Sequence, residues 1–309
     1  MRKAGIPKDY LTGAELSPQA TLDLLKLADE LREERKRGEL RQPLKGKTLA
    51  VLFEKPSLRT HVSFTVGMQE LGGQVVESFS LNRKKEEPED VGRVLAGYVH
   101  AIMLRTHEHS ILERMASKIP LPVINGLSDT HHPCQILADL VTLKQYFGEL
   151  KGLKLSYIGD GNNILHSLLL LCPQLGVGVS YACPKGFEPN AFVLRQARKL
   201  AAEGGAKIEA TNDPTAAVKG SDAIYTDVWT SMGFEAEEGA REAAFQGYQV
   251  NAKLYGLAKP TALIMHCLPM VRGKEITEEM VDHPNSAIFR QAENRLHAQK
   301  ALLLTMMQA

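Results

Sequence analysis

Two hydroxyls and one guanidinium stand together in the stretch Ser57-Leu58-Arg59-Thr60. An apolar run (48–53) precedes it and reads as a buried strand, and apolar residues at helical spacing follow it. The stretch therefore lies where a strand ends and a helix begins. The first turn of a helix has unpaired N–H groups and a partial positive charge, so it attracts anions. These donors suit phosphate, although the stretch taken alone also fits a capped helix with a solvated arginine.

Three more polar side chains follow apolar segments in the first half of the chain. Arg105 comes directly after the apolar run 101–104, and a guanidinium there can bind a carbonyl or phosphate oxygen. His132 and Gln135 are three positions apart at the start of a predicted helix, 133–146, so they lie on one face. An imidazole can donate to a carbonyl oxygen that gains charge, and an amide can both donate and accept. Each residue taken alone also fits a surface or helix-capping role.

Polar groups in the second half of the chain suit an amino acid. The turn 159–163 (Gly-Asp-Gly-Asn-Asn) ends in two adjacent amides, Asn162 and Asn163, which can serve both a carboxylate and an ammonium group. The turn lacks the third glycine of a dinucleotide-binding loop, which disfavours a dinucleotide oxidoreductase. Asp227 follows another apolar run and is a suitable partner for an ammonium group, and Ser231 with the backbone beyond it could hold a second polar group.

A cysteine and an arginine complete the candidate groups. Cys267 follows the apolar segment 261–265, between a histidine and a Leu-Pro pair. It is either a thiol that meets substrate or a buried structural cysteine, and its position alone does not decide between them. Arg295 lies early in a long predicted helix, 291–306.

The composition indicates an ordinary globular protein. The chain has 309 residues, 44% of them hydrophobic and 24% charged, with a net charge of +1. So small a net charge gives no general attraction to nucleic acid or to a membrane surface. Four cysteines without a C-x-x-C pair suggest reduced thiols in a cytoplasmic protein, no signal peptide is visible, and the longest apolar stretch (165–172) is too short to span a bilayer.

Predicted strands and helices alternate along the chain in two series. Helices are expected at 16–31, 90–100, 133–146, 164–172, 191–202 and 291–306, with a solvated helix end and loop at 32–41. Strands are expected at 48–53, 75–79, 101–104, 122–124, 153–158, 177–182, 207–210, 223–226 and 261–265. This alternation predicts an α/β fold: two tandem three-layer αβα domains, each with a mainly parallel sheet, and an active site in the cleft between them. The predicted domains are 1–147 and 148–290, with helix 291–309 packing back on the first.

Seven motifs together resemble one protein family, the aspartate/ornithine carbamoyltransferases. They occur in the family's order and span nearly the whole chain: FEKPSLRT (53–60), HPCQ (132–135), GDGNN (159–163), DVWTSMG (227–233), FQGYQV (245–250), HCLP (266–269) and AENR (292–295). Within the family, the fourth and sixth motifs resemble those of enzymes that act on ornithine rather than aspartate. The resemblance implies transfer of the carbamoyl group of carbamoyl phosphate to the side-chain amine of L-ornithine, giving L-citrulline and phosphate, in the biosynthesis or catabolism of arginine. It implies no metal and no organic cofactor.

The resemblance also implies a role for each site residue. The first domain would bind carbamoyl phosphate and the second would bind ornithine. The residues implied to bind carbamoyl phosphate are Ser57, Leu58, Arg59, Thr60, Arg105, His132, Gln135, Cys267, Leu268 and Arg295. Those implied to bind ornithine are Asn163, Asp227, Ser231 and Met232, the last through its backbone. The catalytic groups would be Arg105 and His132, which polarise the carbonyl oxygen, and Cys267 and Asp227, which lie near the amine.

Two departures from the family pattern and two alternatives remain. The family is trimeric, and the loop that completes a neighbour's site would correspond to 81–90, which here is a run of charges. His61 stands where an arginine commonly follows the threonine, so one charge near the phosphate is weaker or pH-dependent. The acceptor could be an acylated ornithine or another amine, or the chain could be a regulator that binds phosphate or an amino acid without catalysis.

Overall fold

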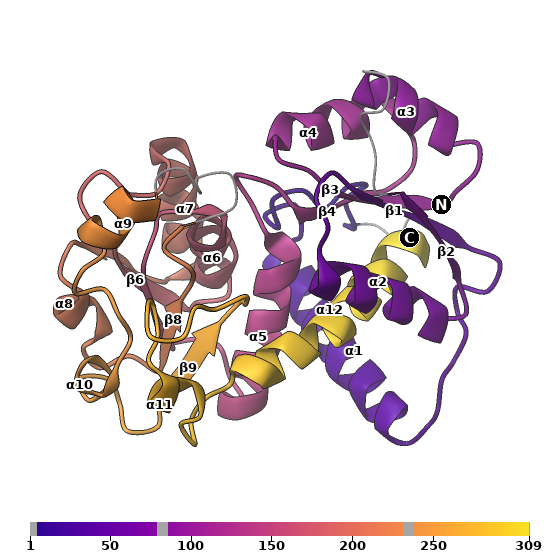
Figure 1. Ribbon diagram of the computed structural model, residues 1–309. Helices are drawn as coiled ribbons and strands as arrows, with labels where there is room; N and C mark the ends of the chain where they lie inside the picture. The colour runs from indigo at the N-terminus through magenta and orange to yellow at the C-terminus, as the bar shows by residue number, and fades with distance from the viewer. Residues whose placement is uncertain (1–4, 79–85, 231–237, 309) are drawn as a thin grey trace. The chain divides into compact units, whose positions relative to one another are not determined.

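The computed structural model describes residues 5–78, 86–230 and 238–308. The chain forms two compact units, the first made of Met1–Val141 with Glu293–Ala309 and the second of Thr142–Ala292. Each unit contains one sheet whose paired strands are all parallel (Figure 1). The prediction of two parallel-sheet α/β domains is confirmed.

The first unit is built on a four-stranded sheet in the order β2-β1-β3-β4. Its strands are β1 (Thr48–Phe53), β2 (Gln74–Ser78), β3 (Ala101–Arg105) and β4 (Val123–Leu127). The helices are α1 (Pro18–Lys36), α2 (Leu58–Glu70), α3 (Pro88–Leu95), α4 (His109–Lys118) and most of α5 (Pro133–Phe147) and α12 (Ile288–Gln308). The chain leaves β1 toward β2 on one side and returns to β3 on the other. The carboxyl ends of β1 and β3 therefore flank the switch point where α/β sheets bind ligands.

The second unit has a five-stranded sheet in the order β7-β6-β5-β8-β9. Its strands are β5 (Lys154–Ile158), β6 (Gly178–Ala182), β7 (Ile208–Thr211), β8 (Ala223–Thr226) and β9 (Leu263–His266). Its helices are α6 (Asn163–Gln174), α7 (Ala191–Gly204), α8 (Pro214–Val218), α9 (Glu238–Ala244), α10 (Ala252–Tyr255) and α11 (Glu278–Val281). The switch point of this sheet lies between β5 and β8, so the residues that follow these two strands are its candidate ligand groups.

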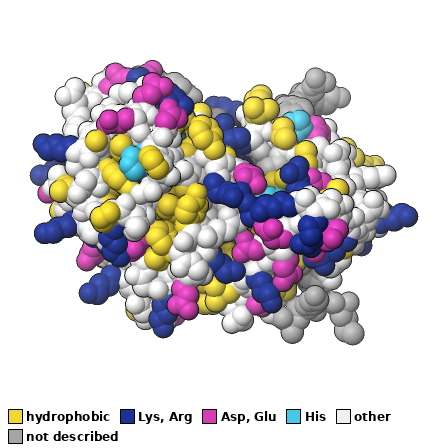
Figure 2. Space-filling view, turned by 90° about the horizontal axis from the view of Figure 1, so that it is seen from below, with side chains coloured by type: hydrophobic (Ala, Val, Ile, Leu, Met, Phe, Trp, Pro, Cys, Tyr) yellow, Lys and Arg dark blue, Asp and Glu magenta, His cyan; other side chains and the backbone are white. Residues whose placement is uncertain are grey.

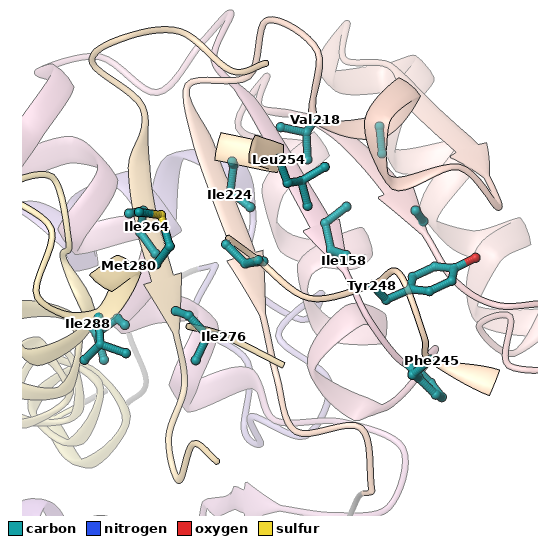
Figure 3. Close-up of a cluster of buried hydrophobic side chains, with 14 residues drawn as sticks. Ile158, Val218, Ile224, Phe245, Tyr248, Leu254, Ile264, Ile276, Met280 and Ile288 are labelled. Carbon is teal, nitrogen blue, oxygen red and sulfur yellow. The ribbon is translucent and has the colours of Figure 1, made fainter. Parts of the chain in front are cut away.

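A buried apolar cluster supports each sheet. In the first unit it includes Ala50, Ile102, Leu104 and Val123 from three neighbouring strands. The cluster of the second unit is drawn in Figure 3, where Ile158, Ile224 and Ile264 come from adjacent strands and others come from the segments that cover them. These strands are buried along nearly their whole length, as expected for parallel strands covered on both sides.

Several predicted helix bounds were wrong. Helix α1 continues to Lys36 through part of the segment predicted as a loop, because Arg32 is buried and Glu33 pairs with both Arg32 and Lys36. Helix α3 ends at Leu95 rather than His100. Helices α4, α8, α9, α10 and α11 were not predicted, and all except α4 have seven residues or fewer. So short a helix has too few turns to show an apolar period.

The surface carries both signs of charge. On the face shown in Figure 2, lysine and arginine side chains are interleaved with aspartate and glutamate. This mixture agrees with the net charge of +1. Among the residues that the structure describes, no helix is long and apolar enough to cross a bilayer.

Candidate active site

The first turn of α2 is arranged to leave its backbone N–H groups available. Ser57 is the N-cap residue, but its side chain makes no capping hydrogen bond. Its hydroxyl instead accepts a hydrogen bond of 2.9 Å from Nη1 of Arg105, at the end of β3. Leu58 is the first helical residue and is 75% exposed, so solvent reaches the start of this turn. An uncapped first turn next to a guanidinium is a favourable place for an anion.

Thr60 is the point where three elements meet. Its side chain is fully buried on α2, and its Oγ1 accepts hydrogen bonds from Nη2 of Arg295 at 2.8 Å and from Nη1 of Arg105 at 3.4 Å. Arg295 lies on α12 and is distant in sequence, yet it shares this oxygen with the β3 arginine. The structure therefore brings Ser57, Thr60, Arg105 and Arg295 together within one unit.

Positive charge is concentrated around these residues. The pKa of Arg105 is lowered to about 10, first by burial and then by the charges of Arg295 and Arg59. The pKa of His132 lies well below its usual value, first because of burial and then because of Arg295, Arg105 and Arg59. His132 is therefore neutral near pH 7 and can donate one N–H without adding charge. Like charges in a buried place repel one another, so a bound anion would stabilise the group.

Gln135 and Cys134 follow His132 in α5 and differ in what they offer. Gln135 is fully buried, and its Nε2 donates to Oδ1 of Asp139, one turn further along the helix, at 2.8 Å. This bond fixes the orientation of the amide. Cys134 donates its thiol to the Asn125 carbonyl at 3.3 Å, and burial raises its pKa to about 12. Cys134 is thus a structural thiol, whereas the Gln135 amide is held in one orientation by Asp139.

The second unit places Asp227 at the centre of another polar group, just beyond β8. Its Oδ1 accepts hydrogen bonds from Sγ of Cys267 at 3.0 Å and from the backbone N–H of Val228 at 2.8 Å. Its Oδ2 accepts from Nδ2 of Asn162 at 2.8 Å. Asp227 and Cys267 are each 6% exposed. Three donors thus bind the carboxylate of Asp227 and fix its orientation.

The amide that contacts Asp227 belongs to Asn162. The turn offered both Asn162 and Asn163, and the resemblance implied Asn163 as the residue that binds ornithine. Asn162 is the N-cap of α6, and its Oδ1 accepts from the backbone N–H groups of Ile164 and Leu165. Its amide nitrogen then points to Asp227. Asn163 is the first residue of the helix. The sequence signal for Asn162 was its capping position, which leaves one side of the amide for another partner.

The turn after β9 carries Cys267 and Leu268. Leu268 has a φ of 61°, in the left-handed region that residues other than glycine rarely adopt, and the Leu268–Pro269 peptide is cis. The backbone N–H of Leu268 donates to Nδ1 of His266 at 2.9 Å.

In the described residues, one group of three side chains has donor atoms close enough together to be considered as a metal site. Donor atoms of Asp227, His266 and Cys267 lie within 4.8 Å of one another. Both ring nitrogens of His266 are engaged, however, Nδ1 by Leu268 and Nε2 by Glu275 at 3.1 Å. A metal ion would have to displace one of these contacts, so the arrangement favours a hydrogen-bonded turn over a metal site.

Two of the predicted ornithine-binding residues lie outside the described residues. Two contacts in the second unit were not predicted. Ser231 and Met232 fall in 231–237, and the candidate cross-subunit loop overlaps 79–85. The unpredicted contacts are the Asn162–Asp227 bond and a buried ion pair between Asp160 and Arg241, at 2.8 Å. Nothing in the local sequence marks Arg241 as buried, because its partner is 81 residues away.

Comparisons with known proteins agree with this architecture. Residues 8–145 match the carbamoyl-P binding domain of aspartate/ornithine carbamoyltransferase, and residues 151–306 match the Asp/Orn binding domain. An ornithine carbamoyltransferase of Anoxybacillus flavithermus is 50% identical over 303 residues, which are 97% of this chain and 96% of that protein. One from Bacillus subtilis is 50% identical over 96% of this chain and 92% of its own length. The structure of ornithine carbamoyltransferase from Pyrococcus furiosus superposes with a TM-score of 0.95 at 45% identity, covering 100% of this chain and 99% of that one.

The fold and the two matching family models define a two-domain α/β transferase with a cluster of arginines in its first unit. The chain belongs to the aspartate/ornithine carbamoyltransferase family. Within that family, these three relatives are ornithine carbamoyltransferases. The predicted family and the predicted carbamoyltransferase activity are confirmed. The comparisons favour ornithine as the acceptor. They do not favour the two alternatives, transfer to another amine and a regulator without catalytic activity.

Proposed function

We propose that the chain transfers the carbamoyl group of carbamoyl phosphate to the side-chain amine of L-ornithine, giving L-citrulline and phosphate. The observation that carries this proposal is the meeting of Arg105, Arg295 and Thr60 beside the uncapped first turn of α2. Three elements converge there, and their guanidinium, hydroxyl and backbone N–H groups can all donate to an oxyanion. A structural role alone would not require a buried arginine, Arg295, beside a half-buried one, Arg105, since their charges repel each other.

The phosphate end of the donor substrate is assigned to the α2 turn. Ser57, Arg59 and Thr60 supply side-chain donors, and Leu58 supplies its backbone N–H. Arg59 is half-buried and near enough to lower the pKa of both Arg105 and His132, which places its charge in the same group. A guanidinium binds phosphate with two parallel, charge-assisted hydrogen bonds.

The carbamoyl end is assigned to the groups around it. Arg105 and the neutral imidazole of His132 would donate to the carbonyl oxygen, where negative charge develops as the amine attacks. Gln135, Arg295 and the turn at Cys267 and Leu268 would orient the carbamoyl group. Phosphate then leaves from the tetrahedral intermediate. Catalysis is thus mainly orientation together with stabilisation of charge, and each of these residues acts by binding.

The amino acid end is assigned to the second unit. Asp227, with Asn163, Ser231 and the Met232 backbone, would bind the α-amino and α-carboxylate groups of ornithine. The side-chain amine must lose a proton before it attacks, since a free alkylammonium has a pKa of about 10. Cys267 and Asp227 share a hydrogen bond and are the groups we assign to receive that proton or position the amine.

The wider setting is also part of the proposal. The first domain, 1–147, would bind carbamoyl phosphate and the second, 148–290, would bind ornithine. The family resemblance supports a homotrimer that acts in arginine metabolism in the cytoplasm, with the 81–90 loop near a neighbour's site. Sedimentation of the purified protein would report the number of subunits.

A panel of amines tests the reaction. Purified protein is given carbamoyl phosphate with ornithine, N-acetylornithine, putrescine or aspartate, and the carbamoylated product and released phosphate are quantified. We expect citrulline and phosphate in equal amounts from ornithine, and a rate at least tenfold lower from the other amines. A failure to form citrulline would reject the proposal, and faster turnover of another amine would reassign the acceptor.

A further inference from the structure

The turn that carries Cys267 and Leu268 is supported from behind by two buried side chains, His266 and Glu275. They are 0% and 1% exposed. Nδ1 of His266 accepts the backbone N–H of Leu268, so the neutral ring carries its proton on Nε2. That proton faces Oε1 of Glu275, 3.1 Å away. The same carboxylate oxygen accepts the backbone N–H of Val271, on the far side of the turn.

Glu275 is fixed by its own surroundings. Its backbone carbonyl accepts a hydrogen bond of 2.9 Å from the N–H of Val250, and the next residue, Ile276, returns with a bridge to Val250. Ile276 is fully buried in the apolar cluster drawn in Figure 3, which also contains Ile264 of β9. The carboxylate therefore extends from a rigid base.

The histidine is tied on its backbone side as well. The N–H of His266 donates to Oε1 of Gln291 at 3.0 Å, and Nε2 of Gln291 donates to the hydroxyl of Tyr225 at 3.0 Å. Tyr225 lies on β8, one residue from its end, so this chain of contacts fixes the end of β9 relative to β8. Those two strand ends carry Cys267 and Asp227.

We propose that Glu275 and His266 are positioning residues of the reaction. They hold Leu268 in its left-handed conformation and direct the Cys267 thiol at Asp227, to which it donates at 3.0 Å. The catalytic meaning of this placement rests on the proposed function of Cys267 and Leu268. The placement itself does not, and it can be tested without substrate.

Three variants alter the support to different degrees. Glu275→Ala removes the acceptor for both His266 and Val271, whereas Glu275→Gln keeps an oxygen that can accept from either. His266→Asn severs the link to Glu275 and keeps an oxygen that can accept the Leu268 N–H, as asparagine does in turns. The matched control is Glu278→Gln, three residues along, because Glu278 is 75% exposed and pairs with the surface Arg272 at 3.0 Å.

The first measurement is the alkylation rate of Cys267 by iodoacetamide, followed by peptide mass mapping. In Glu275→Ala we expect the rate to rise at least tenfold, while Glu275→Gln and the control stay near the parent. Cys172 and Cys183, both fully buried in the same unit, are the internal reference. Should all three cysteines react faster together, Glu275 merely stabilises the unit and the proposal is overturned.

The second measurement is steady-state kinetics. We expect Glu275→Ala to lower kcat for citrulline formation at least tenfold, Glu275→Gln to recover most of it, and inorganic phosphate to bind all variants with similar affinity. Normal kcat and slow Cys267 alkylation in Glu275→Ala would overturn the proposal. If Glu275→Ala does not fold, the same criteria apply to His266→Asn. Absence of citrulline with the parent protein would instead refute the proposed function, while the alkylation rates would still decide the positioning role.

Discussion

At the scale of one residue, Ser57 occupies a helix-capping position but binds a different partner. A serine at an N-cap usually accepts a hydrogen bond from an N–H of its own helix. Here its hydroxyl accepts from Arg105 instead, and the first turn of α2 has no side-chain cap from it. The N–H groups of that turn lack this cap, at the expense of some helix stability, and the proposed function assigns them to phosphate.

Arg59 offers a direct test of the anion site. Arg59→Ala removes the charge-assisted, bidentate contact that we propose with phosphate. We therefore expect kcat/KM for carbamoyl phosphate to fall by roughly a thousandfold, which equals about 4 kcal/mol. Initial rates over a range of carbamoyl phosphate concentrations measure this effect. Arg93→Ala is the control, because Arg93 lies on the surface of α3 with 59% of its side chain exposed. Near-normal kinetics in Arg59→Ala would place the anion elsewhere.

Cys267 can be separated into its hydrogen bond and its thiol chemistry. Cys267→Ser keeps a donor to Asp227, whereas Cys267→Ala removes it. We expect the alanine variant to lower kcat or raise the KM for ornithine roughly tenfold, in line with the loss of one positioned proton-transfer or binding group. The serine variant should be less affected in KM. Unchanged constants in both variants would reduce Cys267 to a packing residue.

At the scale of elements, the sequence predicted the strand ends well and the short helices poorly. Strands such as β1 and β8 are apolar runs that end in polar residues, so both their extent and the residues beyond them could be read locally. By contrast, Arg241 and Glu275 become buried only through partners far along the chain or through a turn. Local sequence patterns do not indicate such partners. The burial of Arg241 and the hydrogen bond between His266 and Glu275 were therefore not predicted.

The register between α2 and α12 depends on a second buried contact. Nζ of Lys300 lies 2.7 Å from Oε2 of Glu70, and the lysine side chain is 2% exposed. Its Cγ passes so close to Gly67 that a Cβ there would lie 3.1 Å from it. This ion pair fixes the helix that carries Arg295 against the helix that carries Thr60.

Removing this lysine should therefore weaken both the fold and the anion site. We expect Lys300→Met to lower the free energy of unfolding by about 2 kcal/mol, less than a typical broken buried pair, because Arg35 still pairs with Glu70 at 2.7 Å. Affinity for inorganic phosphate should fall several-fold as Arg295 loses its register. Urea unfolding and calorimetry measure the two effects. A variant that loses stability but binds phosphate normally would show that the pair does not position Arg295.

At the scale of the whole molecule, the first unit should lose stability in acid because it buries imidazoles. Burial is the main cause that lowers the pKa of His109, His132 and His297, the last to about 4. In the unfolded chain each would titrate near 6.5. Between the two pKa values the unfolded state binds more protons than the folded state, so stability rises with pH across that window and is lost as pH falls through it.

His297 isolates one such contribution. It is 1% exposed, and burial is the largest cause that lowers its pKa. The charge of Glu293 raises the pKa in part, and the charges of Lys300 and Arg32 lower it further. Between pH 6.5 and about pH 4, one buried imidazole contributes a slope of about 1.4 kcal/mol per pH unit. His297→Gln should remove that much of the slope, measured by urea unfolding at several pH values, while the exposed His107→Gln should leave it unchanged. An unchanged slope in His297→Gln would mean that the buried ring accepts its proton without unfolding, and the acid sensitivity of the molecule would then have to arise elsewhere.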